Sequence, residues 1–121
     1  MREIKFKGKR LDNGEWTYGD LLHLVDGVYI SNDNGNNMAQ VNPDTACQFT
    51  GSVDKNGKEI YEGDVIHIGP DYYVVIWVED LGGFYLKVDY AKLPCTSPLG
   101  AMLCRFDFEV IGNINDDQKG G

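Results

Sequence analysis

The chain has 121 residues, of which 42% are hydrophobic and 25% charged, so it is long enough for a single globular domain and too apolar to be disordered. Its net charge of -8 disfavours duplex DNA as a ligand, because proteins bind duplex DNA largely through Lys and Arg. Its longest apolar run, residues 72–78, is too short to cross a membrane, and the first residues do not resemble a signal peptide. We therefore expect a cytoplasmic protein.

The cysteines and the known catalytic motifs give no sign of an active centre. Cys47, Cys95 and Cys104 are widely spaced and form no CxxC pair, so we expect free thiols in a reducing compartment. No P-loop, nucleophile elbow, HExxH or dinucleotide fingerprint occurs. We accordingly expect no cofactor, no metal and no enzymatic activity.

Strand signals dominate the first half of the chain. Residues 4–9 alternate apolar with basic side chains, and residues 12–14 supply a tight turn. Residues 16–24 then predict the return strand of a hairpin, and a turn at 26–27 leads to a short strand at 28–30.

The rest of this half is less regular. The Asn-rich segment 31–37 predicts an exposed, mobile loop, because it cannot bury apolar surface. Pro43 is placed to open a single helical turn before a short strand at 47–50.

The second half predicts further strands at 65–68, 72–78, 84–88 and 106–114. The segment 72–78 is apolar on both faces, which indicates a central strand. Residues 89–100 contain Pro94 and Pro98 and are expected to form a long connection.

Short strands joined by Gly and Asn turns predict an all-β fold. We expect a small SH3-like barrel over residues 54–116, with a smaller N-terminal β-hairpin region over residues 1–53 packed on it. Residues 117–121 would be a flexible tail, and the whole would be one compact unit.

One short pattern occurs twice, in residues 12–24 and 54–68. Each copy has an Asn-Gly turn, an acidic residue, a bulky apolar residue, Gly-Asp, and a short strand with one histidine. We interpret Gly-Asp as a bend in which glycine supplies backbone freedom and aspartate accepts backbone N–H bonds, instead of as a catalytic or metal site. The residues of this structural motif are Gly19, Asp20, Asn56, Gly57, Tyr61, Gly63 and Asp64.

Two groups of polar residues are candidates for an interaction surface. Lys5, Lys7 and Lys9 share one strand face, which predicts a solvated face that guards a sheet edge, or else a contact with nucleic acid or an acidic partner. His23 and His67 occupy matching places in the two copies. We expect them on solvent-facing sides of their strands, a shared metal or pH-sensitive contact being the alternative.

Several aromatic residues of the second half are compatible with a groove that binds Pro-rich peptides or stacks single-stranded bases, but core and cross-strand pairs are the more frequent use of such residues. They are Tyr61, Tyr72, Tyr73, Phe84 and Tyr85.

A series of short motifs runs through the chain: Lys5-Phe6-Lys7-Gly8-Lys9, Trp16-Thr17-Tyr18-Gly19-Asp20, Pro43-Asp44-Thr45, Gln48-Phe49-Thr50-Gly51, Asp54-Lys55-Asn56-Gly57-Lys58, Ile60-Tyr61-Glu62-Gly63-Asp64 and Val110-Ile111-Gly112-Asn113-Ile114. In their order and spacing the chain resembles the YopX family of phage and prophage proteins over nearly its whole length, with Cys47 where a glycine is expected. The resemblance implies a mostly-β fold with an SH3-type barrel and residence in the bacterial cytoplasm. It implies no activity and no catalytic residues.

We therefore expect a non-enzymatic accessory protein that binds another macromolecule. Its partner would be a protein, including one encoded by the host, or a second copy of the chain. One alternative is a nucleic-acid-associated replication or regulatory module that uses the N-terminal lysines. Another is an acidic decoy that occupies a host DNA-binding protein.

Overall fold

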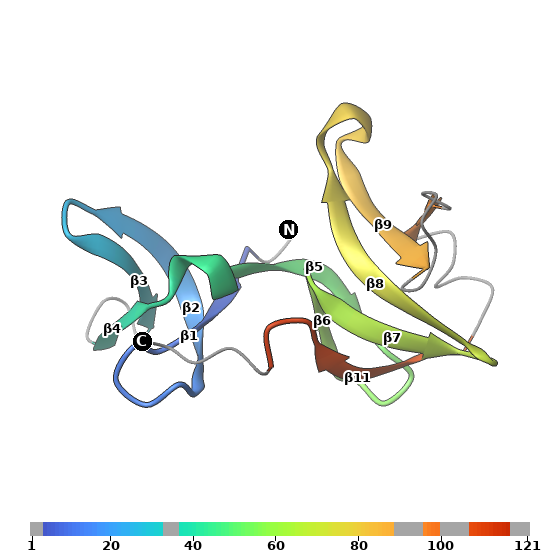
Figure 1. The fold of residues 1–121 in the computed structure, drawn as a ribbon, viewed down its shortest axis with the longest axis horizontal. Coiled ribbons are helices and arrows are strands. Elements are labelled where there is room, and N and C mark those ends of the chain that lie inside the picture. The colour runs from blue at the N-terminus through green and yellow to red at the C-terminus, as the bar shows by residue number, and fades with distance from the viewer. Residues whose placement is uncertain (1–3, 33–36, 89–95, 100–106, 117–121) are drawn as a thin grey trace. The chain divides into compact units, whose positions relative to one another are not determined.

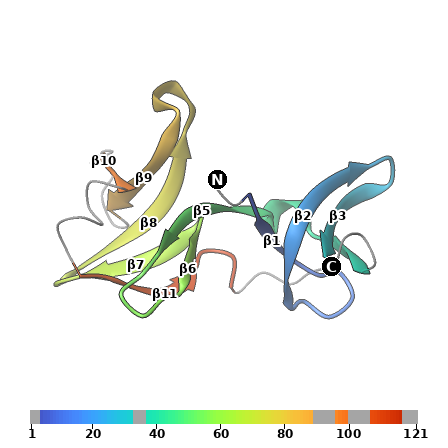
Figure 2. The same ribbon diagram turned by 180° about the vertical axis from the view of Figure 1, so that it is seen from behind.

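A computed structural model describes residues 4–32, 37–88, 96–99 and 107–116 (Figure 1). The described chain is built from antiparallel strands joined by turns, with two short 3-10 turns (Figure 2). The predicted all-β fold is confirmed. Contacts divide the chain into two compact units, the first reaching Phe49 and the second spanning Thr50–Asp116. The tail expected at 117–121 lies outside the described residues.

The strands of the first unit belong to a six-stranded sheet with the order β4-β3-β2-β1-β5-β6, of which β6 and the last residues of β5 fall in the second unit. Its elements are β1 (Phe6–Lys9), β2 (Trp16–Leu24), β3 (Gly27–Asn32), β4 (Asn37–Val41), the 3-10 turn η2 (Pro43–Thr45) and β5 (Cys47–Val53). The predicted hairpin of β1 and β2 and the turn after Pro43 are confirmed. Strand β4 was not predicted, because it follows directly on the Asn-rich segment and forms by pairing with β3. Of that segment, residues 33–36 lie outside the described part of the chain.

A small core holds the first unit together. Ile30 and Val41 are each 1% exposed. A Cβ on Gly8 would meet the Val41 side chain at 3.1 Å, so glycine lets β1 lie close to the end of β4. The backbone N–H of Lys9 donates to Thr45 Oγ1 at 2.9 Å, which fixes η2 against β1.

The second unit contains a five-stranded antiparallel sheet with the order β10-β9-β8-β7-β11. Its elements are β6 (Glu59–Tyr61), β7 (Asp64–Ile68), β8 (Asp71–Val78), the 3-10 turn η3 (Glu79–Leu81), β9 (Gly83–Val88), β10 (Thr96–Pro98) and β11 (Glu109–Asn113). Strand β8 is central, as its apolar pattern predicts. Strand β10 was not predicted, because it lies in the Pro-containing segment 89–100 that was interpreted as a connection.

One face of this sheet covers the core of the second unit. Its buried residues are Ile60, Ile66, Ile68, Val75, Leu86, Leu99 and Phe108. On β7 the buried Ile66 and Ile68 alternate with the half-buried His67, as expected for a strand with one face in the core. Tyr73, Phe84 and Val110 are partly buried against this cluster.

The SH3-like barrel expected over residues 54–116 is not confirmed. The five-stranded sheet ends at β10 on one side and at β11 on the other, and no pairing joins these two strands within the described residues. The sheet is therefore open, and the structure supports an all-β fold of two antiparallel sheets instead of a closed barrel.

The glycine of the first Gly-Asp copy has a different role from the expected one. Gly19 lies inside β2 and not at a bend that leads into a strand. A Cβ at this position would overlap the carbonyl oxygen of Ser31 in β3. Glycine is thus required by the close approach of the neighbouring backbone. Gly63, between β6 and β7, has φ 85° and does form the predicted bend.

We predict that Gly19→Ala lowers the free energy of unfolding by about 1–3 kcal/mol, because the added methyl group forces β2 and β3 apart. Chemical denaturation followed by circular dichroism measures this change. Gly83→Ala is the matched control, since its Cβ would meet only Tyr85 Cε1 at an ordinary 3.7 Å, and it should leave stability nearly unchanged. A Gly19→Ala protein as stable as the wild type would contradict the role assigned to Gly19.

Candidate interaction surface

The Asn56-Gly57 turn is organised by a buried carboxylate. Asp54 is 5% exposed, and its Oδ1 accepts hydrogen bonds from the backbone N–H of Asn56 at 2.9 Å and of Lys58 at 2.8 Å. Its Oδ2 accepts a bond from the backbone N–H of Val110 in β11 at 2.9 Å. Burial raises the pKa of Asp54, but the N–H groups of Val110, Lys58 and Asn56 outweigh it, so its pKa lies below the usual value. The turn is a structural element tied to the last strand.

The second Gly-Asp copy is held in a similar way. Asp64 is 1% exposed; its Oδ2 accepts the backbone N–H of Tyr61 at 2.7 Å, and its Oδ1 accepts Asn113 Nδ2 at 2.8 Å. Asn113 Nδ2 also lies 3.2 Å from the Glu62 carbonyl oxygen, to which it donates. These contacts agree with a structural role for Tyr61, Gly63 and Asp64.

The first Gly-Asp copy has no such arrangement. Asp20 is exposed within β2, where it pairs with Ser31, and it does not lie at a bend. The expectation that both aspartates serve one turn device is therefore wrong for Asp20. The reason is that the similar sequences enter different strands: the first copy continues an existing strand, whereas the second turns between β6 and β7.

The lysines of β1 do not form the solvated face that was expected. Lys7 is 8% exposed and Lys9 7%. The Nζ atoms of Lys7 and Lys9 lie 4.3 Å and 5.3 Å from the centre of the Trp16 ring, and Lys5 Nζ lies 5.4 Å from that of Phe49. Aromatic rings thus cover the aliphatic stems and attract the charges. Strand β1 lies between β2 and β5, so Lys7 and Lys9 guard no sheet edge either.

The two histidines belong to different units and have different surroundings. His67 stacks on Tyr72 with ring centres 4.8 Å apart, and its Nδ1 lies 4.0 Å from Glu109 Oε1. His23 is exposed in β2. Within the described ranges, no cluster of His, Cys, Asp or Glu has the make-up of a metal site.

The aromatic residues considered for a groove are divided between the two faces of the sheet. Tyr61 is 2% exposed, and Tyr73 and Phe84 pack against the core. Tyr72 is 44% exposed and lies on the opposite face beside His67. Alternation along β8 separates Tyr72 from Tyr73, whereas Tyr85, which pairs with Ile76, lies on the same face of the sheet as Tyr72. The five residues therefore do not line one groove.

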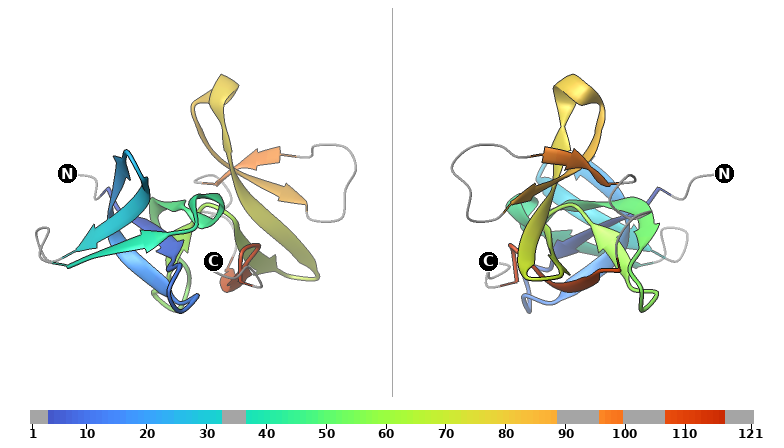
Figure 3. Two further views of the ribbon diagram at one scale, coloured as in Figure 1. Left: turned by 60° about the vertical axis from the view of Figure 1, so that its left-hand side comes forward. Right: turned by 90° about the vertical axis from the view of Figure 1, so that its right-hand side faces the viewer.

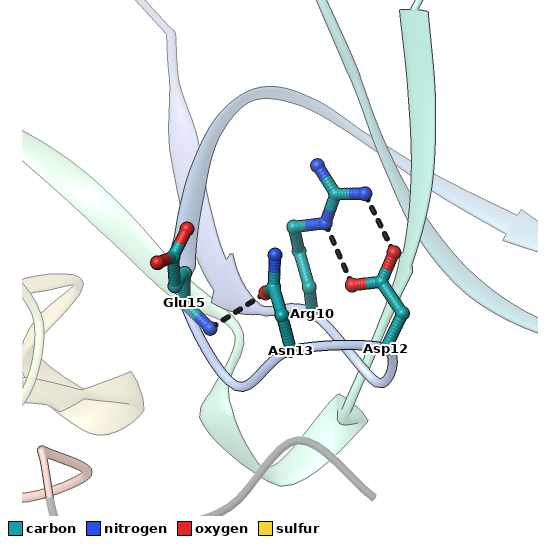
Figure 4. A network of polar contacts seen from close by, with 4 residues as sticks. All are labelled: Arg10, Asp12, Asn13 and Glu15. Carbon is teal, nitrogen blue, oxygen red and sulfur yellow. Dashed lines mark hydrogen bonds and ion pairs between the residues drawn. The ribbon is translucent and has the colours of Figure 1, made fainter.

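A cavity of about 130 Å³ lies in the first unit, well below the ~300 Å³ at which small-molecule sites begin. Its lining residues are Arg10, Thr17, Ile30, Asn32, Asn37, Met38 and Ala39. The guanidinium of Arg10 is bound in a bidentate manner by Asp12, with Nε and Nη2 at 2.9 Å and 2.7 Å from the carboxylate oxygens (Figure 4). The cavity therefore offers little room and an already paired cation.

The end of the β8–β9 hairpin carries exposed apolar side chains that the sequence interpretation missed. Pairing of β8 with β7 stops at Val74, and pairing of β9 with β10 stops at Tyr85. Beyond these residues the two strands of the hairpin pair only with each other within the described part of the chain, and this end projects from the sheet (Figure 3). Trp77 is 44% exposed and Leu81 59%.

The turn of this hairpin has a defined conformation. The 3-10 turn Glu79–Leu81 ends at Gly82, which has φ 61° and whose N–H donates to the Glu79 carbonyl at 3.1 Å. Trp77 meets Phe84 across the strands in an edge-to-face contact, with ring centres 5.0 Å apart. We call Trp77, Glu79, Asp80, Leu81 and Phe84 the hairpin tip. In the sequence, the hairpin tip could have been recognised by Leu81, an apolar residue within an otherwise polar, Gly-rich turn.

We predict that Asp54→Asn lowers the free energy of unfolding by about 1–3 kcal/mol near neutral pH, because the amide cannot accept all three backbone bonds. Since the folded-state pKa lies below the unfolded value of about 4, the carboxylate's contribution is present above that pH and is lost as the pH falls through the folded pKa. Urea denaturation at neutral and at acid pH should therefore show the difference between variant and wild type shrinking in acid.

The control for this prediction is Asp12→Asn, at the matching position of the first copy. Asp12 is exposed and pairs with the exposed Arg10, so its replacement should change stability little at either pH. Equal effects of Asp54→Asn and Asp12→Asn would contradict the role given to Asp54.

We also predict that Asp64→Asn destabilises the protein by about 1–3 kcal/mol, because an amide nitrogen would face either the Tyr61 N–H or the Asn113 amide. Asp20→Asn, the matched change on an exposed strand, should be nearly neutral. Thermal unfolding of both variants measures the two effects. A destabilised Asp20→Asn protein together with an unaffected Asp64→Asn protein would contradict the prediction.

Comparison with known proteins identifies the family of the chain. Among the described residues, no helix is both long and apolar enough to span a membrane. No curated protein matches the chain. The family model described as YopX protein matches residues 2–119, nearly the whole length. The chain therefore belongs to the YopX family.

Proposed function

We propose that this protein is a non-enzymatic, phage- or prophage-encoded accessory protein of the bacterial cytoplasm that acts by binding another protein. The observation that supports this proposal is the hairpin tip, where Trp77 and Leu81 are exposed on a turn of defined conformation. Tryptophan is enriched among the residues that dominate protein–protein affinity, and a preorganised turn loses little entropy on binding.

The contacts of the polar motif residues support a role other than catalysis. The carboxylates of Asp54 and Asp64 are occupied by backbone and amide donors. Such residues shape the unit and are not placed to transfer protons to a substrate. The SH3-like barrel stays a prediction for residues 54–116, and closure between β10 and β11 would be needed to complete it.

The acidic decoy is the second candidate. In residues 50–116 acidic residues outnumber basic ones by more than two to one. A surface of this kind attracts proteins that bind nucleic acid through basic patches. The nucleic-acid-associated module receives less support, because Lys7 and Lys9 are buried against Trp16.

The proposal predicts a direct protein partner. The full chain, immobilised and exposed to a lysate of nuclease-treated bacteria that carry its gene, should retain a protein that an unrelated acidic protein of similar size does not retain. The retained protein, identified by mass spectrometry and purified, should bind the chain directly in isothermal titration calorimetry.

The same material separates the alternatives. Displacement of the chain from its partner by duplex DNA would favour the decoy, and independence of DNA would favour the plain interaction module. Fluorescence anisotropy with a single-stranded oligonucleotide tests the nucleic-acid reading, which requires binding that weakens steeply with salt. Retention of no specific protein would contradict the proposed function.

A further inference from the structure

We infer that the hairpin tip of the second unit is the docking site, and that the partner is a protein with an apolar pocket bordered by Lys or Arg side chains. This inference rests on the proposed function and assigns it a place and a partner chemistry. Three properties of the tip support it: the exposure of its apolar groups, the rigidity of its turn and the sign of its charges.

The apolar groups exceed what the hairpin needs for its own stability. The edge-to-face contact of Trp77 with Phe84 stabilises two strands that, among the residues that the structure describes, have no third strand beside them. This contact accounts for part of the Trp77 surface. It does not account for Leu81, which is 59% exposed at the turn. A projecting leucine beside an exposed indole edge suits insertion into a pocket better than contact with a flat surface.

The turn presents these groups in a fixed arrangement. Gly82 closes the 3-10 turn in the left-handed conformation, and its N–H binds the Glu79 carbonyl. The backbone of Leu81 is therefore placed at the end of the hairpin before any partner arrives. Binding then requires little ordering of the chain.

The charges of the tip select among possible occupants. Glu79 and Asp80 are exposed beside the apolar groups and require basic residues around the complementary pocket. A second copy of the chain shares the net charge of -8, and nucleic acid and anionic membranes are also negative, so each of these would be repelled. A basic protein surface remains the occupant that fits.

The chain contains a comparison within itself. The β2–β3 hairpin of the first unit also has an apolar tip, with Val25 fully exposed and Leu24 45% exposed. Its acidic residue, Asp26, has a hydrogen-bond partner within the hairpin, because its Oδ2 accepts a bond from the hydroxyl of Tyr29 at 2.9 Å. This tip carries no exposed tryptophan and no second acidic residue, so it provides exposed apolar control positions.

The test uses the partner purified as described above and the full chain with substitutions in either tip. Leu81→Ser should weaken binding at least about tenfold, whereas Val25→Ser should leave the dissociation constant within about twofold. The charge reversal Glu79→Lys with Asp80→Lys should weaken binding and abolish its salt dependence. The reversal Asp20→Lys with Asp44→Lys changes the net charge equally on the first unit and should retain most of the affinity.

Circular dichroism and thermal unfolding verify that each variant is folded, and Leu81→Ser leaves the Trp77–Phe84 contact in place as a safeguard. Equal affinity of Leu81→Ser and the wild type for the partner would overturn the docking site while leaving the proposed function intact. Affinity that is unchanged by the charge reversal in the tip would overturn the basic rim. A concentration-dependent dimer lost in Leu81→Ser by light scattering would identify a second copy as the occupant, and failure to retain any partner would overturn both proposals.

Discussion

The second unit depends on two buried carboxylates that accept hydrogen bonds from distant parts of the chain. A buried carboxylate without donors would be strongly destabilising, but Asp54 and Asp64 each meet backbone or amide donors at 2.7–2.9 Å. Through Val110 and Asn113 they attach the loop before β6 and the bend before β7 to the last strand, β11. The β6 and β7 segments and the end of the unit are thereby fixed together by hydrogen bonds in addition to the apolar core.

In the first unit an aromatic ring, that of Trp16, has the connecting role that the buried carboxylates have in the second unit. Trp16 covers Lys7 and Lys9, and the backbone of Lys9 is bound by Thr45. Within each unit, residues of one of the motifs by which the chain resembles its family thus contact residues of another such motif. The hairpin tip lies outside all of them, so its side chains can serve recognition without disturbing those contacts.

The sequence predicted those features that depend on local chemistry. The hairpin of β1 and β2, the central strand β8 and the bend at Gly63 follow from alternation, apolar content and positive φ, and all are present. Strands β4, β6 and β10 were not predicted, because neighbouring strands impose their conformation on segments with weak intrinsic preference.

The errors at the candidate site have the same origin. Whether Lys7 is solvated depends on Trp16, which lies on the neighbouring strand β2. Whether Asp20 lies at a bend depends on which strands flank it. Neither property can be predicted from the residues next to Lys7 or Asp20 in the sequence. Trp77 was grouped with a core strand because its alternation is that of the core face; its exposure arises because the flanking strands stop short of it.

Strand β5 has a consequence for work with parts of the protein. Its first residues, Cys47 to Phe49, belong to the first unit and pair with β1, whereas Thr50 to Val53 belong to the second unit, where the Thr50 hydroxyl donates to the Ile60 carbonyl. The boundary is thus a continuous strand and not a linker. A cut between Phe49 and Thr50 would leave the bonds to Lys5, Phe6 and Lys7 in the first fragment and the Thr50–Ile60 bond in the second. A fragment boundary placed a few residues further on, inside Thr50–Val53, would instead remove from the second unit strand residues that bond within it.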